Sequence, residues 1–220
     1  MQIRRLAGVA VAAAAITGLL APGIASAADN GSQQRAQLGN RSLAAALTAH
    51  GNGKFDHNWN DYDIVTQAVL AVLKAKPGSP VSVLAQGTVR LTAFIPDDRA
   101  FRRLAKDLTG TAPSTEKSTF NGLVSAVGVD TIEQVLLYHV VPGARITAKA
   151  ALRSNGAVLT TAQGGTITVG VADRKVPLIV LQDKDPDALD PIVDPAGLNI
   201  NKGNKQIAHG IVFVLRPADL

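Results

Sequence analysis

The sequence predicts a single α+β domain in which helices precede strands. Between residues 63 and 138, apolar residues recur at the spacing of one helix face. After Gly143 the pattern changes, and residues 166–171 alternate between apolar and polar or small side chains, as a half-buried strand does. No segment repeats at a fixed period, so we expect one copy of the fold rather than a tandem array.

The first 27 residues have the features of a secretory signal peptide. Arg4 and Arg5 precede an apolar stretch over residues 6–20, and residues 25–27, Ala-Ser-Ala, fit a cleavage site. Glycine and proline interrupt the apolar stretch, which argues against a permanent anchor. We expect residues 1–27 to be removed by general secretion. The mature protein should then have no membrane span and be extracellular or loosely associated with the cell surface.

The composition fits one exported domain. Removing 27 of 220 residues leaves 193, enough for a domain with an extension. The formal net charge falls from +5 to +3 because Arg4 and Arg5 are lost, and so small an excess does not indicate nucleic acid binding. The chain has no cysteine, so it must depend on packing rather than on disulfides.

Residues 28–60 are predicted to be a polar extension with one short helix over residues 42–49. Residues 28–40 offer almost nothing to bury. The Gly- and Asn-rich loop over residues 50–60 has Phe55 and Trp59 as its only large apolar anchors. The domain itself is expected to cover residues 61–220.

The first helix of the domain is predicted from Asp63, as its cap, to Lys74. The segment LTAFIPDDRAF at residues 91–101 then predicts a buried strand that leads directly into a helix. Its apolar run is ended by Pro96, and the Asp97 side chain can cap the helix that follows. Gly110 suits the end of that helix.

Two further helices and four strands complete the prediction. Residues 120–127 have helical spacing, and Asp130 and Glu133 form a capping-box-like opening for a helix through Tyr138, which Pro142 and Gly143 should terminate. The predicted strands cover residues 158–161, 166–171, 176–183 and 207–215. We expect the last, nearly all apolar, to be central and buried.

Two segments resemble the most recognisable stretches of the fasciclin (FAS1) domain family. Residues 91–101 are similar to TVFAPTDEAF, and residues 136–143, LLYHVVPG, match the family form. The resemblance covers roughly residues 61–220 and is to the secreted bacterial single-domain type. It implies a curled β-sandwich or wedge with several helices packed along it, and an extracellular adhesion role. Phe213 departs from the family, which usually has a histidine there.

Standard catalytic motifs are absent from the sequence. There is no G-x-S-x-G elbow, H-E-x-x-H motif or phosphate-binding glycine loop, so we expect neither an enzyme nor a cofactor. The interpretation is recognition of an extracellular protein or an anionic surface polysaccharide. The alternative is a small-molecule carrier or hydrolase with a pocket between helices and sheet.

Two groups of residues are candidates for partner binding. Tyr138 and His139 match the family and, in some animal members, this neighbourhood is linked to adhesion. A structural role for His139, bound to backbone carbonyls at a helix end, is favoured. The second group is a basic stripe on one helix face, which could hold anionic polysaccharide or could simply be solvated. The stripe consists of Arg99, Arg102, Arg103 and Lys106, with Asp98 and Asp107 expected to weaken its field.

The acidic loop DKDPDALDPIVD at residues 183–194 has some features of a calcium loop. Its candidate ligands are Asp183, Asp185, Asp187 and Asp194. Ala188 stands where such loops need glycine, and the last ligand is not glutamate, so an exposed loop between strands is the favoured interpretation.

Overall fold

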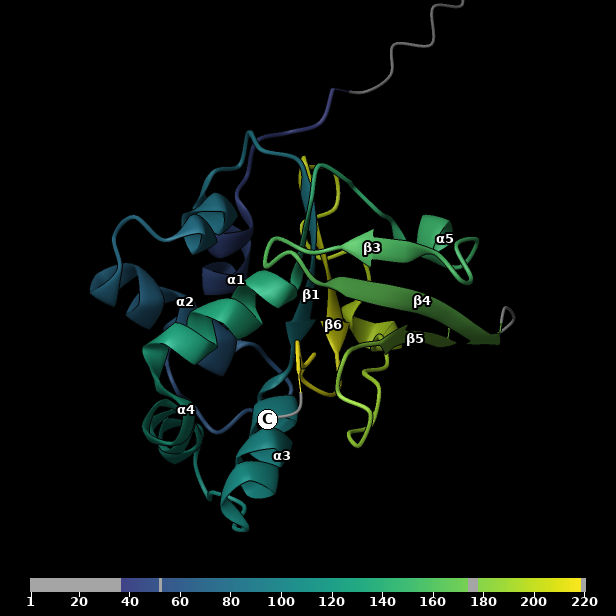
Figure 1. Ribbon diagram of the computed structural model, residues 1–220. Helices are drawn as coiled ribbons and strands as arrows, with labels where there is room; N and C mark the ends of the chain where they lie inside the picture. Colours follow the sequence, from purple (N-terminus) through teal and green to yellow (C-terminus); the bar gives the residue numbers. More distant parts are fainter. Residues whose placement is uncertain (1–36, 52, 174–177, 219–220) are drawn as a thin grey trace, which may run out of the picture. The chain divides into compact units, whose positions relative to one another are not determined.

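The computed structural model describes residues 37–51, 53–173 and 178–218 (Figure 1). The predicted signal peptide, residues 1–27, and residues 28–36 of the predicted extension lie outside this range. Within it, no helix combines the length and apolar character needed to cross a bilayer.

Helices dominate the first half of the described chain, as the sequence predicts, and strands the second. The helices and 3-10 turns are α1 (Leu43–Gly51), α2 (Asp63–Ala75), η1 (Pro80–Ala85), α3 (Asp98–Thr109), α4 (Glu116–Tyr138), α5 (Ala148–Ala151) and η2 (Pro195–Gly197). The strands are β1 (Leu91–Pro96), β2 (Val140–Pro142), β3 (Val158–Thr160), β4 (Thr166–Asp173), β5 (Leu178–Gln182) and β6 (Gln206–Ile211). This arrangement confirms the α+β class.

Strand β1 is the centre of the first sheet, whose order is β2-β1-β6. It pairs antiparallel with β2 and parallel with β6, from Leu91 opposite Gln206 to Pro96 opposite Ile211. The expectation that the last strand is central was therefore wrong, although every residue of β6 is buried. The burial comes instead from single bridges that Ile200 and Val193 make to its other side.

The two faces of β1 belong to two different cores. Ala93 and Ile95 lie in the apolar cluster that α1 to α4 cover, whereas Phe94 lies in the cluster formed with β4 and β5. Alternate side chains of a strand point to opposite faces, which explains this division. The second sheet, β3-β4-β5, is an antiparallel meander (Figure 1). Its buried side chains belong to the same cluster as Phe94.

Residues 37–60 pack into the same compact unit as the rest of the described chain. The backbone N–H of Gly39 donates to the Gly203 carbonyl at 2.9 Å, and that of Leu43 to the Gln206 side chain at 2.7 Å. Leu43 is completely buried. The part of the predicted extension that the structure describes is thus integrated into the domain.

The junction between β1 and α3 forms as the sequence predicts. The Asp97 carboxylate accepts from the Ala100 N–H at 2.7 Å and caps α3. At the other end, Gly110 adopts the left-handed conformation with φ 74°. The strand, its proline stop and both caps were all correctly predicted.

The predicted cap of α2 was wrong. Asp63 is the first helical residue, and the preceding Tyr62 makes no side-chain cap. The carboxyl group of Asp98 accepts instead from the N–H groups of Asp63 and Ile64, at 3.3 and 2.9 Å. The start of α2 is therefore satisfied by a side chain 35 residues away.

The helices predicted around residues 120–138 form one element with a break at Gly128. This glycine has φ 76° and ψ 167°, so the interruption lies before Asp130 rather than at it. The carboxylates of Asp130 and Glu133 instead pair with the Lys76 ammonium. The chain then enters β2, so Pro142 ends a strand and not a helix.

The strands of the second sheet are confirmed with somewhat different bounds. The last predicted strand ends at Ile211, four residues early, because Phe213 and its neighbours leave the sheet and pass α3. Residues 174–177, part of the predicted strand over residues 176–183, lie outside the described residues. The short helix predicted over residues 42–49 forms as α1, whereas β2, α5, η1 and η2 were not predicted, because each is too short to show a period.

The break at Gly128 generates a prediction. Gly128→Ala should lower the free energy of unfolding by about 1–3 kcal/mol, because an L side chain is strained at this φ and ψ. Urea denaturation would measure the change. Gly122→Ala, in a regular part of α4 with no atom within 4 Å of the added Cβ, should stabilise by about 0.5–1 kcal/mol. Equal effects of the two substitutions would contradict this assignment.

Candidate functional site

Helix α3 exposes the predicted basic stripe on the face opposite its buried residues. Phe101, Leu104 and Ala105 are buried, whereas the cationic side chains between them turn outward. The four cations line a hollow of about 280 Å³ together with Ala112, which follows the helix. These side chains are Arg99, Arg102, Arg103 and Lys106.

Two of the arginines are held in place by neighbouring groups. The Arg102 Nε donates to the Pro113 carbonyl at 2.7 Å, and its guanidinium lies 5.0 Å from the centre of the Trp59 ring. The Arg103 guanidinium donates to the Val212 carbonyl and lies 4.9 Å from the Phe213 ring. Cation–π contacts of this kind reduce the freedom of the side chains while leaving their charge available.

The acidic residues expected to weaken the stripe are directed elsewhere. Asp98 is fully buried at the start of α2, and Asp107 pairs with the Arg216 guanidinium at 2.5 Å. Only Arg99 of the stripe pairs with a carboxylate in the described range, that of Asp97 at 3.3 Å. The other three cations of the stripe, Arg102, Arg103 and Lys106, make no ion pair with the described residues.

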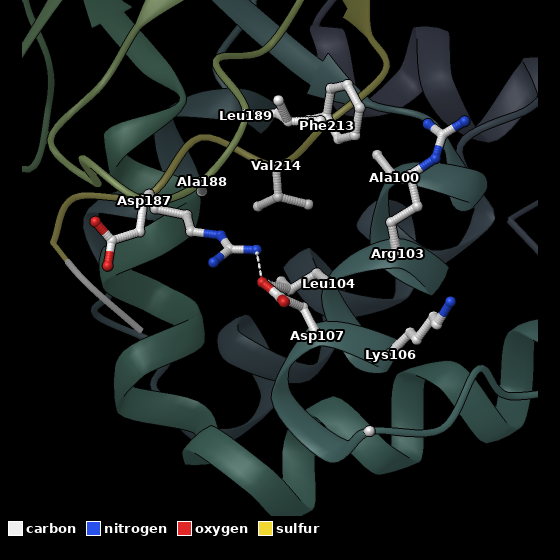
Figure 2. Close-up of a pocket in the computed structure, with 12 residues that line it drawn as sticks. Ala100, Arg103, Leu104, Lys106, Asp107, Asp187, Ala188, Leu189, Phe213 and Val214 are labelled. Atoms are coloured by element: carbon white, nitrogen blue, oxygen red, sulfur yellow. Dashed lines mark hydrogen bonds and ion pairs between the residues drawn. The ribbon is translucent and has the colours of Figure 1, made fainter.

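A second hollow of about 480 Å³ lies next to the first and shares two of its cations (Figure 2). Arg103 and Lys106 form one side of it, and Leu189 and Phe213 supply apolar wall. The dashed line at Asp107 in Figure 2 marks its ion pair with Arg216, which also lines this hollow. The surface beside α3 is thus concave, cationic on one side and partly apolar on the other.

Tyr138 and His139 are buried inside the protein, not exposed to a partner. The Tyr138 hydroxyl donates to the Thr166 carbonyl at 2.7 Å. The His139 Nε2 accepts from the Leu215 N–H at 3.0 Å, so its Nδ1 carries the proton and donates to the Val135 carbonyl at 2.6 Å. Burial lowers the pKa of His139 to about 4. These contacts support the structural role, in which His139 links the end of α4 to the backbone of Leu215.

The structure does not gather the carboxylates of the predicted calcium loop around one point. Asp183 accepts from the Arg216 N–H at 2.7 Å, and Asp185 pairs with the Arg216 guanidinium at 3.1 Å. Asp194 caps η2, and Asp187 is exposed. The loop is held by Arg216, a residue far along the chain.

Sequence reasoning missed a different group of carboxylates. They lie where α2, α3 and α4 begin, and four of them are buried. They are Asp56, Asp61, Asp63, Asp98 and Glu116. The one signal available in the sequence was that each of these helices starts with an acid, which also occurs in ordinary helices.

A small internal space lies between α2, α3 and α4 and is also lined by His139. It is too small for a ligand. It measures about 40 Å³ and is lined almost entirely by apolar side chains. Pockets for small molecules usually occupy about 300–1,000 Å³. In the part of the chain that the structure describes, this space does not favour the alternative of a carrier or hydrolase.

Comparisons with known proteins point to one family. The family model described as the fasciclin domain matches residues 65–215. A solved structure, a FAS1 domain pair from the insect cell adhesion molecule fasciclin I, is similar with 16% identity and a TM-score of 0.48. The match covers 69% of this chain and 46% of that one, so the chain spans about half of its length. No curated protein matches the sequence.

The buried contacts of His139 generate a stability prediction. His139→Ala should lower the free energy of unfolding by about 2–3 kcal/mol, because the Leu215 N–H is left without an acceptor in the interior. Thermal and urea denaturation would measure this loss. A variant with the wild-type melting temperature and a lost binding activity would contradict the structural role.

The lowered pKa of His139 also predicts a dependence on pH. The folded pKa of about 4 lies below the ordinary value of 6.5, so the unfolded state binds the proton more tightly. The contribution of His139 to stability is complete above pH 6.5 and falls by up to about 3 kcal/mol as the pH drops towards 4. The difference in unfolding free energy between wild type and His139→Ala should therefore shrink over this range. A constant difference would contradict the assignment.

Proposed function

The chain belongs to the fasciclin domain family, and we propose that it is a secreted adhesion module that binds anionic polysaccharide without catalysis. Binding would take place at a cell surface or in an extracellular matrix. Secretion rests on the signal peptide expected at residues 1–27, and adhesion on the role that the family resemblance implies.

One observation carries the choice of partner. Four cationic side chains surround a single hollow on α3, and all but Arg99 make no ion pair with the described residues, because Asp98 is buried and Asp107 pairs with Arg216. A guanidinium donates to two oxygens of a carboxylate or sulfate at once, and Arg102 and Arg103 are already oriented by their aromatic neighbours. A polymer with such groups at regular intervals would meet several of these cations together.

A polysaccharide fits this surface better than a folded protein. Protein interfaces usually have an apolar centre with a polar rim. Among the described residues, the large exposed apolar side chains are Leu70, Val158 and Leu189, which lie on α2, on β3 and in the loop after β5. They form no common patch, so the cations of α3 provide most of the attraction. Such attraction must weaken as salt is added.

The proposed function predicts a loss of binding when charge is reversed on α3. Arg103→Glu with Lys106→Glu should weaken binding to a heparin matrix roughly tenfold, so that the variant elutes at lower salt. Two exposed charge contacts, each worth roughly 0.2–1 kcal/mol, become repulsive. The salt concentration needed for elution would measure the change. Circular dichroism and melting temperature would show whether the variant is folded.

The control reverses the same number of charges elsewhere. Lys149→Glu with Lys202→Glu changes two exposed lysines outside α3 and alters the net charge equally. This variant should elute close to the wild type. If both variants lose retention equally, only net charge matters and the assignment to α3 is wrong. Undiminished retention of the α3 variant would also defeat the proposal.

A further inference from the structure

Five carboxylates converge where three helices begin. Asp63, Asp98 and Glu116 are the first residues of α2, α3 and α4, and Asp56 and Asp61 belong to the loop before α2. One oxygen from each of Asp63, Asp98 and Glu116 lies within 4.8 Å of the others, and the same holds for Asp56, Asp61 and Asp63. Asp63 belongs to both groups and is the centre of this acid cluster.

Three members of the acid cluster have an oxygen without a hydrogen-bond donor. Asp61 Oδ1, Asp63 Oδ2 and Glu116 Oε1 are buried and accept no hydrogen bond from the described residues. The exposed fractions of these residues are 7%, 1% and 1%. Buried carboxylate oxygens are normally satisfied, so these three indicate a missing ligand.

The second oxygens of two of these residues are satisfied, which fixes the side chains. Asp61 Oδ2 accepts from the Asn58 side chain at 3.1 Å, and Glu116 Oε2 accepts from the Asp56 N–H at 2.7 Å. The free oxygens are therefore held in position by the loop that covers the cluster. A site whose ligands are already oriented loses little entropy when it binds.

Within the described parts of the chain, no lysine, arginine or histidine side chain pairs with the acid cluster. Helix N-termini attract negative charge, and Asp98 satisfies the N–H groups of Asp63 and Ile64 in this way. That role explains Asp98 but leaves the three free oxygens without a partner.

Several buried carboxylates so close together must take up either protons or a cation. Without a cation, protons are favoured. Burial raises the pKa of Asp63 to about 7, and burial together with the carboxyl of Asp61 raises the pKa of Asp98 to about 9. A divalent cation would replace these protons and offset the repulsion.

We propose that Asp63, Asp98 and Glu116 bind a calcium ion, with the Asp98 carboxylate also holding the start of α2. The donors are oxygens alone, which suit a hard cation and not zinc. Calcium accepts irregular sets of carboxylate oxygens, whereas magnesium demands near-octahedral geometry and keeps several of its waters, so a buried group of carboxylates suits calcium better.

Asp56 gives the ion a route to the site. It is the exposed member of the acid cluster and lies in the loop that precedes α2. Calcium arriving from solvent can meet Asp56 first and then pass to the buried oxygens. This site is separate from the loop over residues 183–194 in which the sequence suggested calcium, and it does not depend on the function proposed for α3.

Calcium titration of the full chain tests the proposal. Isothermal titration calorimetry in calcium-free buffer should show one bound ion per chain, and 10 mM calcium should raise the melting temperature by about 3–10 °C. Magnesium at the same concentration should raise it less. No heat and no shift would mean that protons alone occupy the cluster, and an equal response to magnesium would overturn the calcium assignment.

Two variants distinguish ligand loss from misfolding. Asp63→Asn with Glu116→Gln removes the charge that calcium would offset, so this variant should melt at or above the wild-type temperature without calcium and should not respond to it. Asp107→Asn with Asp130→Asn removes two exposed carboxylates outside the acid cluster and the loop over residues 183–194, and should keep the full response. A calcium response in the first variant, or its loss in the second, would overturn the proposal.

Discussion

The structure depends on β1 being buried on both faces. Ala93 and Ile95 face the helices, Phe94 faces the second sheet, and neither core could form without this strand. Its parallel pairing with β6 also joins segments that are more than a hundred residues apart in the chain. The apolar run at residues 91–95 is thus the element on which the two cores are built.

The position of β1 determines which side chains of α3 are buried and which are exposed. Asp97 caps the helix immediately after the strand, so the helix leaves the sheet in a fixed orientation. The next residue, Asp98, is carried inward to the start of α2, and Arg102, Arg103 and Lys106 are carried outward. One short junction therefore places both the basic stripe and Asp98, one member of the acid cluster. The stripe faces solvent because the core occupies the other side of the same helix.

Sequence reasoning succeeded where the determinants are local. The strand, proline stop and cap around Asp97 lie within a few residues, and the side chains of the stripe follow from helical spacing. It failed where a partner is distant in the chain. The cap of α2 comes from Asp98, and Arg216 draws Asp107 away from the stripe. No local pattern contains such contacts.

The dependence on distant contacts also explains why the candidate sites were only partly predicted from the sequence. His139 has a local bond to Val135, which the sequence suggested, and a remote one to Leu215, which it did not. The acid cluster combines residues from a loop and three helices, so each acid looked like an ordinary helix start. Its oxygens are buried without a hydrogen-bond donor only because the three helices pack together, and no local sequence pattern indicates that packing.

The central claim is that the exposed face of α3 is the binding surface. NMR titration of the isotope-labelled chain with a sulfated oligosaccharide tests it most directly. The account predicts that amide signals of residues 99–112 shift with the ligand, and that the shifts disappear at high salt. Signals of α5 and β3 should stay unchanged. Shifts centred on another surface, with α3 unaffected, would contradict the account.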